Sequence, residues 1–299
     1  MHIYFSGAGG VGIGPLAEIA HQAGYEVSGS DLARNLMTDQ LTSLGIQVAI
    51  GQDGSQIAAV HEQKPIDWFV YTAALPDDHP ELVFAREHGI RTSKRDELLA
   101  EIIKQKNLHL IAVAGTHGKT TTTGMLIWAA QQLGVPVSYS IGTTINFGPS
   151  GLYDPQSKYF IYECDEYDRN FLHFHPWASI VTAIDHDHVD TYPTEDEYYA
   201  AFDQFIGQSE WAILWQEDCG DLSKVMGQNT RLHLIDKAKV QASGRLDRIP
   251  LVGQHNRENA YLVKTLLVDH LGVNEEKAIE ILGNFPGTDR RFEKLADNL

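Results

Sequence analysis

The stretch AVAGTHGKTTTT, residues 112–123, follows the apolar run LHLI and decides what kind of domain surrounds it. The pattern predicts a strand over residues 108–114, a glycine loop over 115–118 and a helix over 119–133. Glycines let backbone amides close on phosphate oxygens, and the N-terminus of a helix adds a partial positive charge. The stretch therefore predicts a phosphate-binding loop within an α/β fold.

Two side chains of this loop have chemical roles to fill. Lys119 is expected to reach the terminal phosphates of a nucleotide, and the hydroxyl of Thr120 to take a Mg²⁺ position. Val113 departs from the general G-x-x-x-x-G-K-[ST] pattern, which has a glycine there. A glycine turn with a capping threonine and no ligand is the alternative. We expect the nucleotide, because strand, loop and helix follow in the order that phosphate binding requires.

Length and composition limit the other possibilities. A chain of 299 residues is long enough for two domains. The net charge of −17 argues against nucleic acid or an anionic membrane as partner, since those are bound by basic surfaces. Cys164 and Cys219 lie far apart and indicate neither a disulfide framework nor a metal site. Residues 1–10, MHIYFSGAGG, lack the basic and apolar regions of a signal peptide, so a cytoplasmic location is expected.

The organisation is predicted from alternating patterns. Strand-like runs over residues 2–6, 25–28, 47–50 and 68–72 alternate with helical spacing, which is typical of βαβ units and a parallel sheet. A polar break, KQKN, follows a helix predicted over residues 94–106. We place a boundary there, between a domain of residues 1–106 and one of residues 107–299. The predicted class is α/β, with a Rossmann-like first domain and a P-loop ATP-binding second domain whose sheet is mostly parallel.

The first domain opens with a glycine loop of its own. Gly7, Gly9 and Gly12 follow the strand of residues 2–6, and Asp31 comes about twenty residues later, which satisfies the dinucleotide fingerprint. Taken alone, this pattern supports an NAD(P)-dependent oxidoreductase. The same loop can hold any pyrophosphate. It carries no lysine, so we expect it to offer backbone amides alone.

Four more motifs follow the phosphate loop in order. They are YECDEYD (162–168), DHDHVDTY (185–192), GQHNRENA (253–260) and FPGTDRRF (285–292). Together the five resemble the Mur ligases, the ATP-dependent amino-acid ligases of peptidoglycan precursor synthesis. Val113 fits this family, whose loop has the shorter form. Folylpolyglutamate synthases share the ATP domain but lack the glycine-rich first unit.

The resemblance implies roles in the second domain. ATP would be bound by Gly115, Thr116, His117, Gly118, Lys119, Thr120, Thr121, His255, Asn256, Asn259 and Arg290. Mg²⁺ would be held by Glu163 and His188 with Thr120, and the catalytic residues would be Lys119, Glu163 and His188. GQHNRENA resembles the family's adenine motif, with His255 and Asn256 at the adenine and Asn259 in its neighbourhood. These residues are expected to precede an apolar helix of residues 260–271. Ala183 departs from the family, where an asparagine usually stands.

An alternative for the metal comes from histidines. His173, His175, His186 and His188 crowd together with acidic residues, which would also suit a zinc site. Solvated loop histidines are the simpler interpretation for the first three.

In the first domain the resemblance implies a UDP-sugar site at Gly9, Gly10, Val11, Gly12, Asp31, Thr72, Ala73 and His79. The implied reaction joins L-alanine to UDP-N-acetylmuramate through an acyl phosphate. The alternatives are a recycling ligase that adds a tripeptide to the same sugar nucleotide, and the oxidoreductase. The family's C-terminal amino-acid-binding domain would begin where this chain stops, so we expect it to be absent. The sequence does not indicate an oligomeric state.

Overall fold

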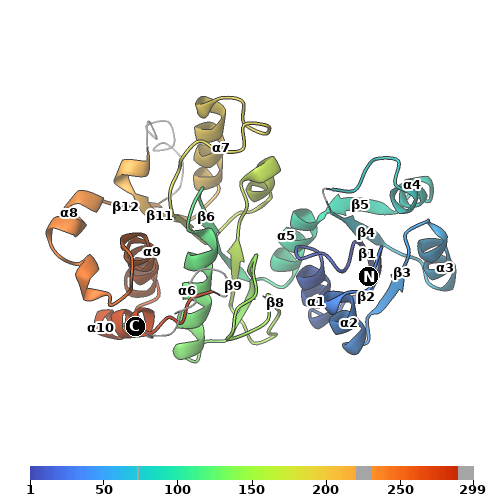
Figure 1. The fold of residues 1–299 in the computed structure, drawn as a ribbon, viewed down its shortest axis with the longest axis horizontal. Coiled ribbons are helices and arrows are strands. Elements are labelled where there is room, and N and C mark those ends of the chain that lie inside the picture. The colour runs from blue at the N-terminus through green and yellow to red at the C-terminus, as the bar shows by residue number, and fades with distance from the viewer. Residues whose placement is uncertain (73, 220–230, 289–299) are drawn as a thin grey trace, which may run out of the picture. The chain divides into compact units, whose positions relative to one another are not determined.

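The computed structural model describes residues 1–72, 74–219 and 231–288 (Figure 1). Contacts divide the chain into two compact units, Met1–Asn107 with Gly151–Pro155, and Leu108–Ser150 with the residues from Gln156 onward. Each unit is built around a sheet of parallel strands with helices between them. The predicted α/β class is therefore confirmed.

The sheet of the first unit has the order β3-β2-β1-β4-β5, and all of its pairings are parallel. Its strands are β1 (His2–Ser6), β2 (Glu26–Asp31), β3 (Gln47–Ile50), β4 (Trp68–Tyr71) and β5 (Arg91–Lys94). The order changes direction between β1 and β4. Loops that leave the carboxyl ends of these two strands diverge there and open the crevice where such sheets bind ligands.

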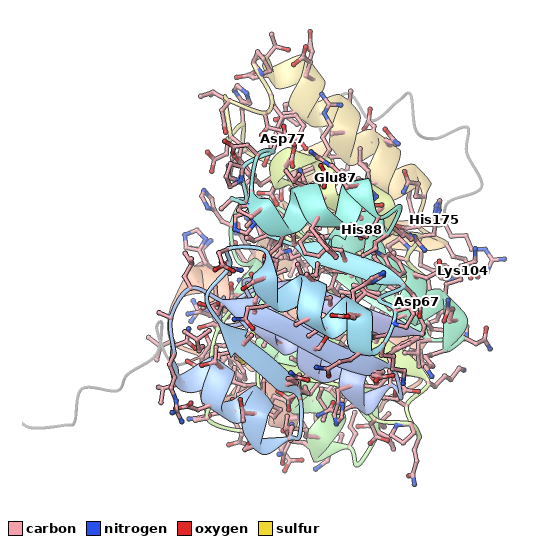
Figure 2. All side chains as sticks on the ribbon, turned by 90° about the vertical axis from the view of Figure 1, so that its right-hand side faces the viewer. Asp67, Asp77, Glu87, His88, Lys104 and His175 are labelled. Atoms are coloured by element: carbon pink, nitrogen blue, oxygen red, sulfur yellow. The ribbon has the colours of Figure 1, made fainter. Side chains whose placement is uncertain are left out.

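Four helices connect these strands: α1 (Gly14–Gln22), α2 (Leu36–Ser43), α3 (Ser55–Gln63) and α4 (Pro80–Glu87). A fifth helix, α5 (Arg95–Gln105), follows β5. Asn35 and Thr38 form a capping box that starts α2. Helix α4 presents Glu87, with His88 following it (Figure 2), and its Arg86 pairs with Asp77 at 2.9 Å. Buried apolar side chains fill the space between these helices and the sheet.

The second sheet has the order β12-β11-β10-β6-β9-β7-β8. The pairings from β12 through to β7 are parallel. The strands are β6 (His109–Ala114), β7 (Val137–Ser140), β8 (Gly151–Leu152), β9 (Tyr159–Glu163), β10 (Ala178–Val181), β11 (Trp211–Trp215) and β12 (Arg231–Ile235). Strand β6 lies between β9 and β10. Because the three strands are parallel, the segments that follow them start side by side at their carboxyl ends.

The helices of the second unit are α6 (Lys119–Gln132), α7 (Glu195–Gly207), α8 (Lys237–Ala242), α9 (Gln254–Thr265) and α10 (Glu275–Gly283). Helix α6 contacts β6, β7 and β9, and α9 and α10 pack against α6 (Figure 1). Short helical turns are η1 (Tyr167–His173), η2 (Gln216–Cys219), η4 (Leu246–Arg248) and η5 (Leu266–His270). None of the helices within the described ranges is long and apolar enough to cross a membrane.

One predicted boundary was wrong. The helix expected over residues 260–271 begins at Gln254 as α9, so the adenine motif occupies its first turns rather than preceding it. The side-chain amide of Asn256 donates to the carbonyl of Val252 at 2.7 Å, which ties the first turn to the preceding loop. The first turns of this helix are polar, and a polar stretch is typical of a loop, so the apolar pattern predicted a later start.

Candidate functional site

The phosphate loop requires both of its glycines. Gly115 has φ of 129°, and a Cβ on it would lie 2.4 Å from the hydroxyl oxygen of Thr182. Gly118 has φ of 83°, and a Cβ there would lie 2.8 Å from the side-chain nitrogen of Asn259. Any other residue would be strained and would collide with its neighbours. The loop therefore packs directly against the end of β10 and against α9.

Hydrogen bonds hold the loop in place. The amide of Thr116 donates to the Ala183 carbonyl at 3.0 Å, and its hydroxyl donates to the Asp185 carbonyl at 2.8 Å. The hydroxyl of Thr182 donates to the carbonyl of His117. Thr116 therefore fixes the phosphate loop to the segment that follows β10.

A cavity of about 560 Å³ opens beside this loop. The residues that the sequence predicted and that line it are His117, Gly118, Thr121, His255, Asn256 and Asn259. The phosphate loop and the adenine motif, far apart in the chain, therefore share one cavity. Ala183 lines it too, so the position where the family has an asparagine faces the same space.

The cavity also contains charged residues that were not among the predicted site residues. Lys237 and Glu258 form an ion pair of 2.9 Å, and the Glu258 side chain is buried. Asp218 lines the cavity as well, and burial raises the pKa of its carboxyl. Lys237 begins α8 and Asp218 lies in η2, in segments without a recognisable pattern. Sequence reasoning had no local signal for them.

Lys119, at the start of α6, meets a buried acid. Its ammonium donates to the Gly115 carbonyl at 2.7 Å and to both carboxylate oxygens of Glu166 at 2.9 Å. Glu166 is fully buried; burial raises the pKa of its carboxyl, and the Lys119 charge opposes that rise. Sequence analysis chose Glu163 from the same acidic segment and missed Glu166. The signal was present in YECDEYD, but the pattern could not tell which acid pointed inward.

The predicted metal ligands have different partners. Thr120 and Glu163 bond to each other, whereas His188 pairs with Glu166, which was not predicted. Glu163 accepts from the Thr120 hydroxyl at 2.7 Å and from the Gly142 amide at 2.8 Å. His188 lies 3.4 Å from a carboxylate oxygen of Glu166. Hydroxyl and carboxylate oxygens are the ligands that Mg²⁺ prefers, so Thr120 and Glu163 fit a magnesium ion by their chemistry.

The histidines do not form the zinc cage considered as an alternative. Within the described parts of the chain, the one group of three candidate ligands is Asp165, Glu166 and His188. The ring of His186 is paired with the Tyr192 carbonyl at 2.9 Å.

Backbone strain marks the same region. His188, Asp168 and Arg169 have left-handed φ values of 56°, 53° and 57°. Each such residue costs about 1–3 kcal/mol and persists only where the surroundings enforce it. The amide of Tyr192 donates to the His188 carbonyl at 2.8 Å, and its hydroxyl donates to the Glu166 carbonyl at 2.6 Å. This residue ties both strained segments together beside Lys119.

The glycine loop of the first unit holds itself together in part. The amides of Gly7 and Ala8 donate to the Ser30 carbonyl, each at 2.9 Å. The amide of Gly9 donates to Asp31 at 2.7 Å, and the other oxygen of that carboxylate accepts from Ala33 at 3.2 Å. In a dinucleotide site this acid binds a ribose hydroxyl. Here each Asp31 oxygen accepts from one backbone amide, which fixes the carboxylate beside the loop.

The remaining sugar-site residues are placed as follows. Thr72 lies beside Gly7, with its methyl 3.5 Å from where a Cβ of that glycine would stand. The ring of His79 accepts from the Glu81 amide at 3.3 Å and caps α4. Ala73 and Arg290 lie outside the described residues.

Beneath the first glycine loop lies a buried carboxylate, Glu81, which sequence reasoning missed. It is fully buried and accepts from Tyr4 at 2.9 Å, Ser6 at 2.5 Å and Ser30 at 2.8 Å. The amide of Gln52 donates to it at 3.3 Å. Glu81 therefore joins the ends of β1 and β2, from which the loop starts.

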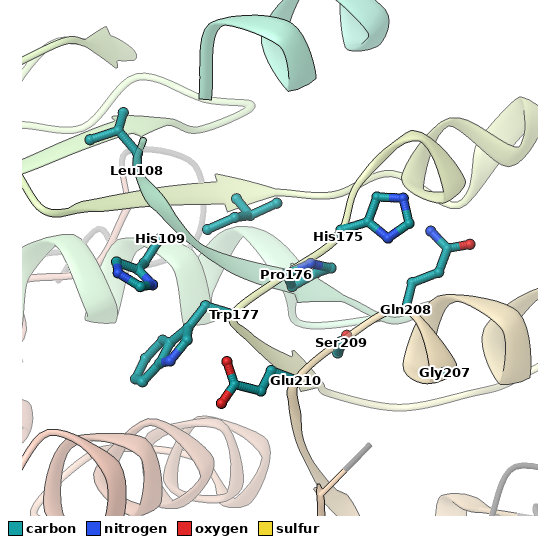
Figure 3. A pocket seen from close by; sticks show the side chains of 10 residues that line it. Leu108, His109, His175, Pro176, Trp177, Gly207, Gln208, Ser209 and Glu210 are labelled. Carbon is teal, nitrogen blue, oxygen red and sulfur yellow. The ribbon is translucent and has the colours of Figure 1, made fainter. Parts of the chain in front are cut away.

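A second cavity, of about 480 Å³, lies at the amino ends of strands in the second sheet (Figure 3). It is formed where β6 begins and where the segments before β10 and β11 arrive, and it includes His109, His175, Trp177 and Glu210. His175 is thus at the amino ends of these strands, away from the phosphate loop at their carboxyl ends.

Comparison with known proteins identifies relatives of both units. Residues 2–107 match the model of the Mur ligase family, catalytic domain, and residues 113–243 match the Mur ligase middle domain. The chain is 35% identical over 321 residues to a UDP-N-acetylmuramate–L-alanine ligase of Psychrobacter sp. (strain PRwf-1). That alignment covers 98% of this chain and 65% of the relative, so the chain spans less than two thirds of its length.

Two solved structures are similar throughout. The UDP-N-acetylmuramate:L-alanyl-gamma-D-glutamyl-meso-diaminopimelate ligase of Neisseria meningitides has a TM-score of 0.80 and 27% identity, and covers 97% of this chain and 99% of its own. The UDP-N-acetylmuramate-alanine ligase of Thermotoga maritima has a TM-score of 0.77 and 25% identity, over 98% of this chain and 70% of its own.

Proposed function

Since this chain belongs to the Mur ligase family, we propose that it serves an ATP-dependent ligase that extends UDP-N-acetylmuramate for peptidoglycan synthesis. In this proposal the second unit binds ATP and the first unit binds the sugar nucleotide. The observation that carries it is the cavity shared by Gly118 and Asn259, with Lys119 beside it at the start of α6. That arrangement suits a nucleotide whose phosphates lie on the loop and whose base lies against α9.

The reaction proposed is acyl activation followed by amide formation. The carboxylate of UDP-N-acetylmuramate attacks the γ-phosphorus of ATP, the bond to the β-phosphate oxygen breaks, and ADP leaves. The amine of the incoming amino acid then attacks the acyl carbon and expels phosphate. Lys119 supplies a positive charge beside the phosphates, where negative charge accumulates as ADP leaves.

Thr120 and Glu163 would hold Mg²⁺ next to these phosphates, with His188 nearby. When bound, the ion neutralises charge on the phosphate oxygens and helps to orient them. Glu163 is itself held by the Gly142 amide, so its carboxylate is already oriented toward Thr120.

L-alanine is our first choice for the added group, because the relative with 35% identity is an L-alanine ligase. A tripeptide is the second choice, because the Neisseria structure, with a TM-score of 0.80, is that of a tripeptide ligase. The two choices differ in the acceptor alone.

Calorimetry on the purified chain tests the proposal as a whole. We expect binding of UDP-N-acetylmuramate and of an ATP analogue, and no binding of NAD. Binding of NAD without binding of the UDP-sugar would replace the ligase with an oxidoreductase.

A further inference from the structure

We infer that Arg95 supplies the fixed cation that binds the diphosphate of the sugar nucleotide at the first glycine loop. The inference rests on the proposed function, because it assigns a residue to the site proposed for UDP-N-acetylmuramate. It also corrects the expectation that this loop offers backbone amides alone.

The guanidinium of Arg95 lies directly against Gly12. A Cβ added to this glycine would stand 2.6 Å from one terminal nitrogen of Arg95 and 3.6 Å from its central carbon. Arg95 is the first residue of α5, and its Nε donates at 3.2 Å to Asp96, whose side chain is buried. The buried acid holds the guanidinium in place, and Gly12 leaves the space that it occupies.

The glycine loop beside this guanidinium uses some of its backbone amides for its own hydrogen bonds and leaves others unused. Those of Gly9 and Gly10 donate to Asp31 and to the Gly7 carbonyl. In the described residues, the amides of Val11 and Gly12 have no hydrogen-bond partner, and Val11 is 87% exposed. The loop therefore offers the amides of Val11 and Gly12 as donors for a ligand, immediately before α1 and with the Arg95 guanidinium against Gly12.

This combination suits two adjacent phosphates better than a single charge. Backbone amides before a helix bind one phosphate, and the planar guanidinium can donate two parallel hydrogen bonds to the oxygens of the other. A local cation also matters electrostatically, because the chain carries a net charge of −17 and the Asp31 carboxylate contacts the same loop. Without Arg95, a dianionic diphosphate would approach a predominantly acidic protein.

The test uses calorimetry with UDP-N-acetylmuramate on the complete chain. Arg95→Gln is expected to lower the affinity about tenfold or more, because it loses the charged hydrogen bonds to the diphosphate, and Arg95→Lys is expected to lower it less, because it keeps the charge. Added NaCl should weaken binding to the parent more steeply than binding to Arg95→Gln. Affinity for an ATP analogue should stay unchanged in both variants.

Two further variants keep the test specific. Lys104→Gln removes the same charge from an exposed position at the far end of the same helix (Figure 2), and it should bind like the parent. Gly12→Ala retains Arg95 but pushes its guanidinium away, so it should also lose about tenfold or more. It provides the answer if Arg95→Gln fails to fold.

The outcomes separate the two proposals. If the parent binds the UDP-sugar and Arg95→Gln binds it equally well, with the same salt dependence, the role of Arg95 is wrong and the proposed function stands. If the parent does not bind the UDP-sugar, the proposed function fails first.

Discussion

The ammonium nitrogen of Lys119 lies 2.9 Å from each carboxylate oxygen of Glu166, and Glu166 is completely buried. A lysine expected to serve phosphates is therefore held by an acid that solvent does not reach. Removing one partner of such a pair leaves an uncompensated buried charge. We infer that the Glu166 carboxylate competes with a phosphate for this ammonium, which also donates to the Gly115 carbonyl beside the loop where phosphates would bind.

Replacing Lys119 tests the phosphate loop. Lys119→Met should reduce the affinity for an ATP analogue about tenfold or more, because the loop loses its charged donor. The affinity for UDP-N-acetylmuramate should be unchanged, and calorimetry measures both. Since the variant leaves Glu166 unpaired, the double variant Lys119→Met with Glu166→Gln serves as control for stability. An ATP affinity equal to that of the parent would rule out the assigned role of Lys119.

Replacing Glu166 alone tests whether its carboxylate competes with phosphates for the Lys119 ammonium. In Glu166→Gln the ammonium no longer has to leave a carboxylate to reach a phosphate, and the triphosphate meets one negative charge fewer. We expect the affinity for the ATP analogue to rise by about two- to tenfold, or about 0.4–1.4 kcal/mol. Asp168→Asn removes a charge from the same segment and should change the affinity less. Weaker binding by Glu166→Gln would contradict this competition and would show that the carboxylate positions the ammonium for the phosphates.

The metal assignment is tested through Glu163. Mg²⁺ should tighten the binding of the ATP analogue to the parent, and Glu163→Gln should abolish most of that gain, because it removes an anionic ligand. The comparison is calorimetry with Mg²⁺ and with EDTA for each protein. His173→Gln, a substitution at a histidine outside the proposed site, should retain the full Mg²⁺ effect. Zinc that stays bound to the purified protein during mild chelation would favour the histidine alternative instead.

The buried network beneath the first loop predicts a stability effect. Glu81→Leu removes the acceptor of four side-chain donors and should destabilise the first unit by about 2–5 kcal/mol. Glu81→Gln keeps part of the network and should cost less. Hydrogen exchange of peptides from β1 and β2 measures the effect, while peptides from the second unit act as internal controls. Equal protection in Glu81→Leu and the parent would show that the network does not stabilise these strands.

Local patterns in the sequence determined most of the elements. The strands predicted over residues 2–6 and 47–50 are β1 and β3 with the same bounds. The helix predicted to start at residue 119 is α6: Gly118, with φ of 83°, ends the loop, and most of the helix that follows is buried. Short strands and glycine loops depend on neighbouring residues, which is why composition and spacing were enough to predict an α/β fold with two glycine loops.

The sequence alone did not reveal the charged residues around those loops. Lys237 and Arg95 belong to no motif, and Glu166 lies in YECDEYD without any mark that separates it from the other acids there. Each of the three meets its partner through strand order and helix packing. Parallel strands bring their carboxyl ends to one edge, so a residue following β9 can contact a lysine that follows β6. Which acid in an acidic segment faces inward depends on the backbone, and here the left-handed Asp168 and Arg169 shape that segment. Tertiary structure decided these pairs because burial and opposite charge act between residues that the chain itself keeps far apart.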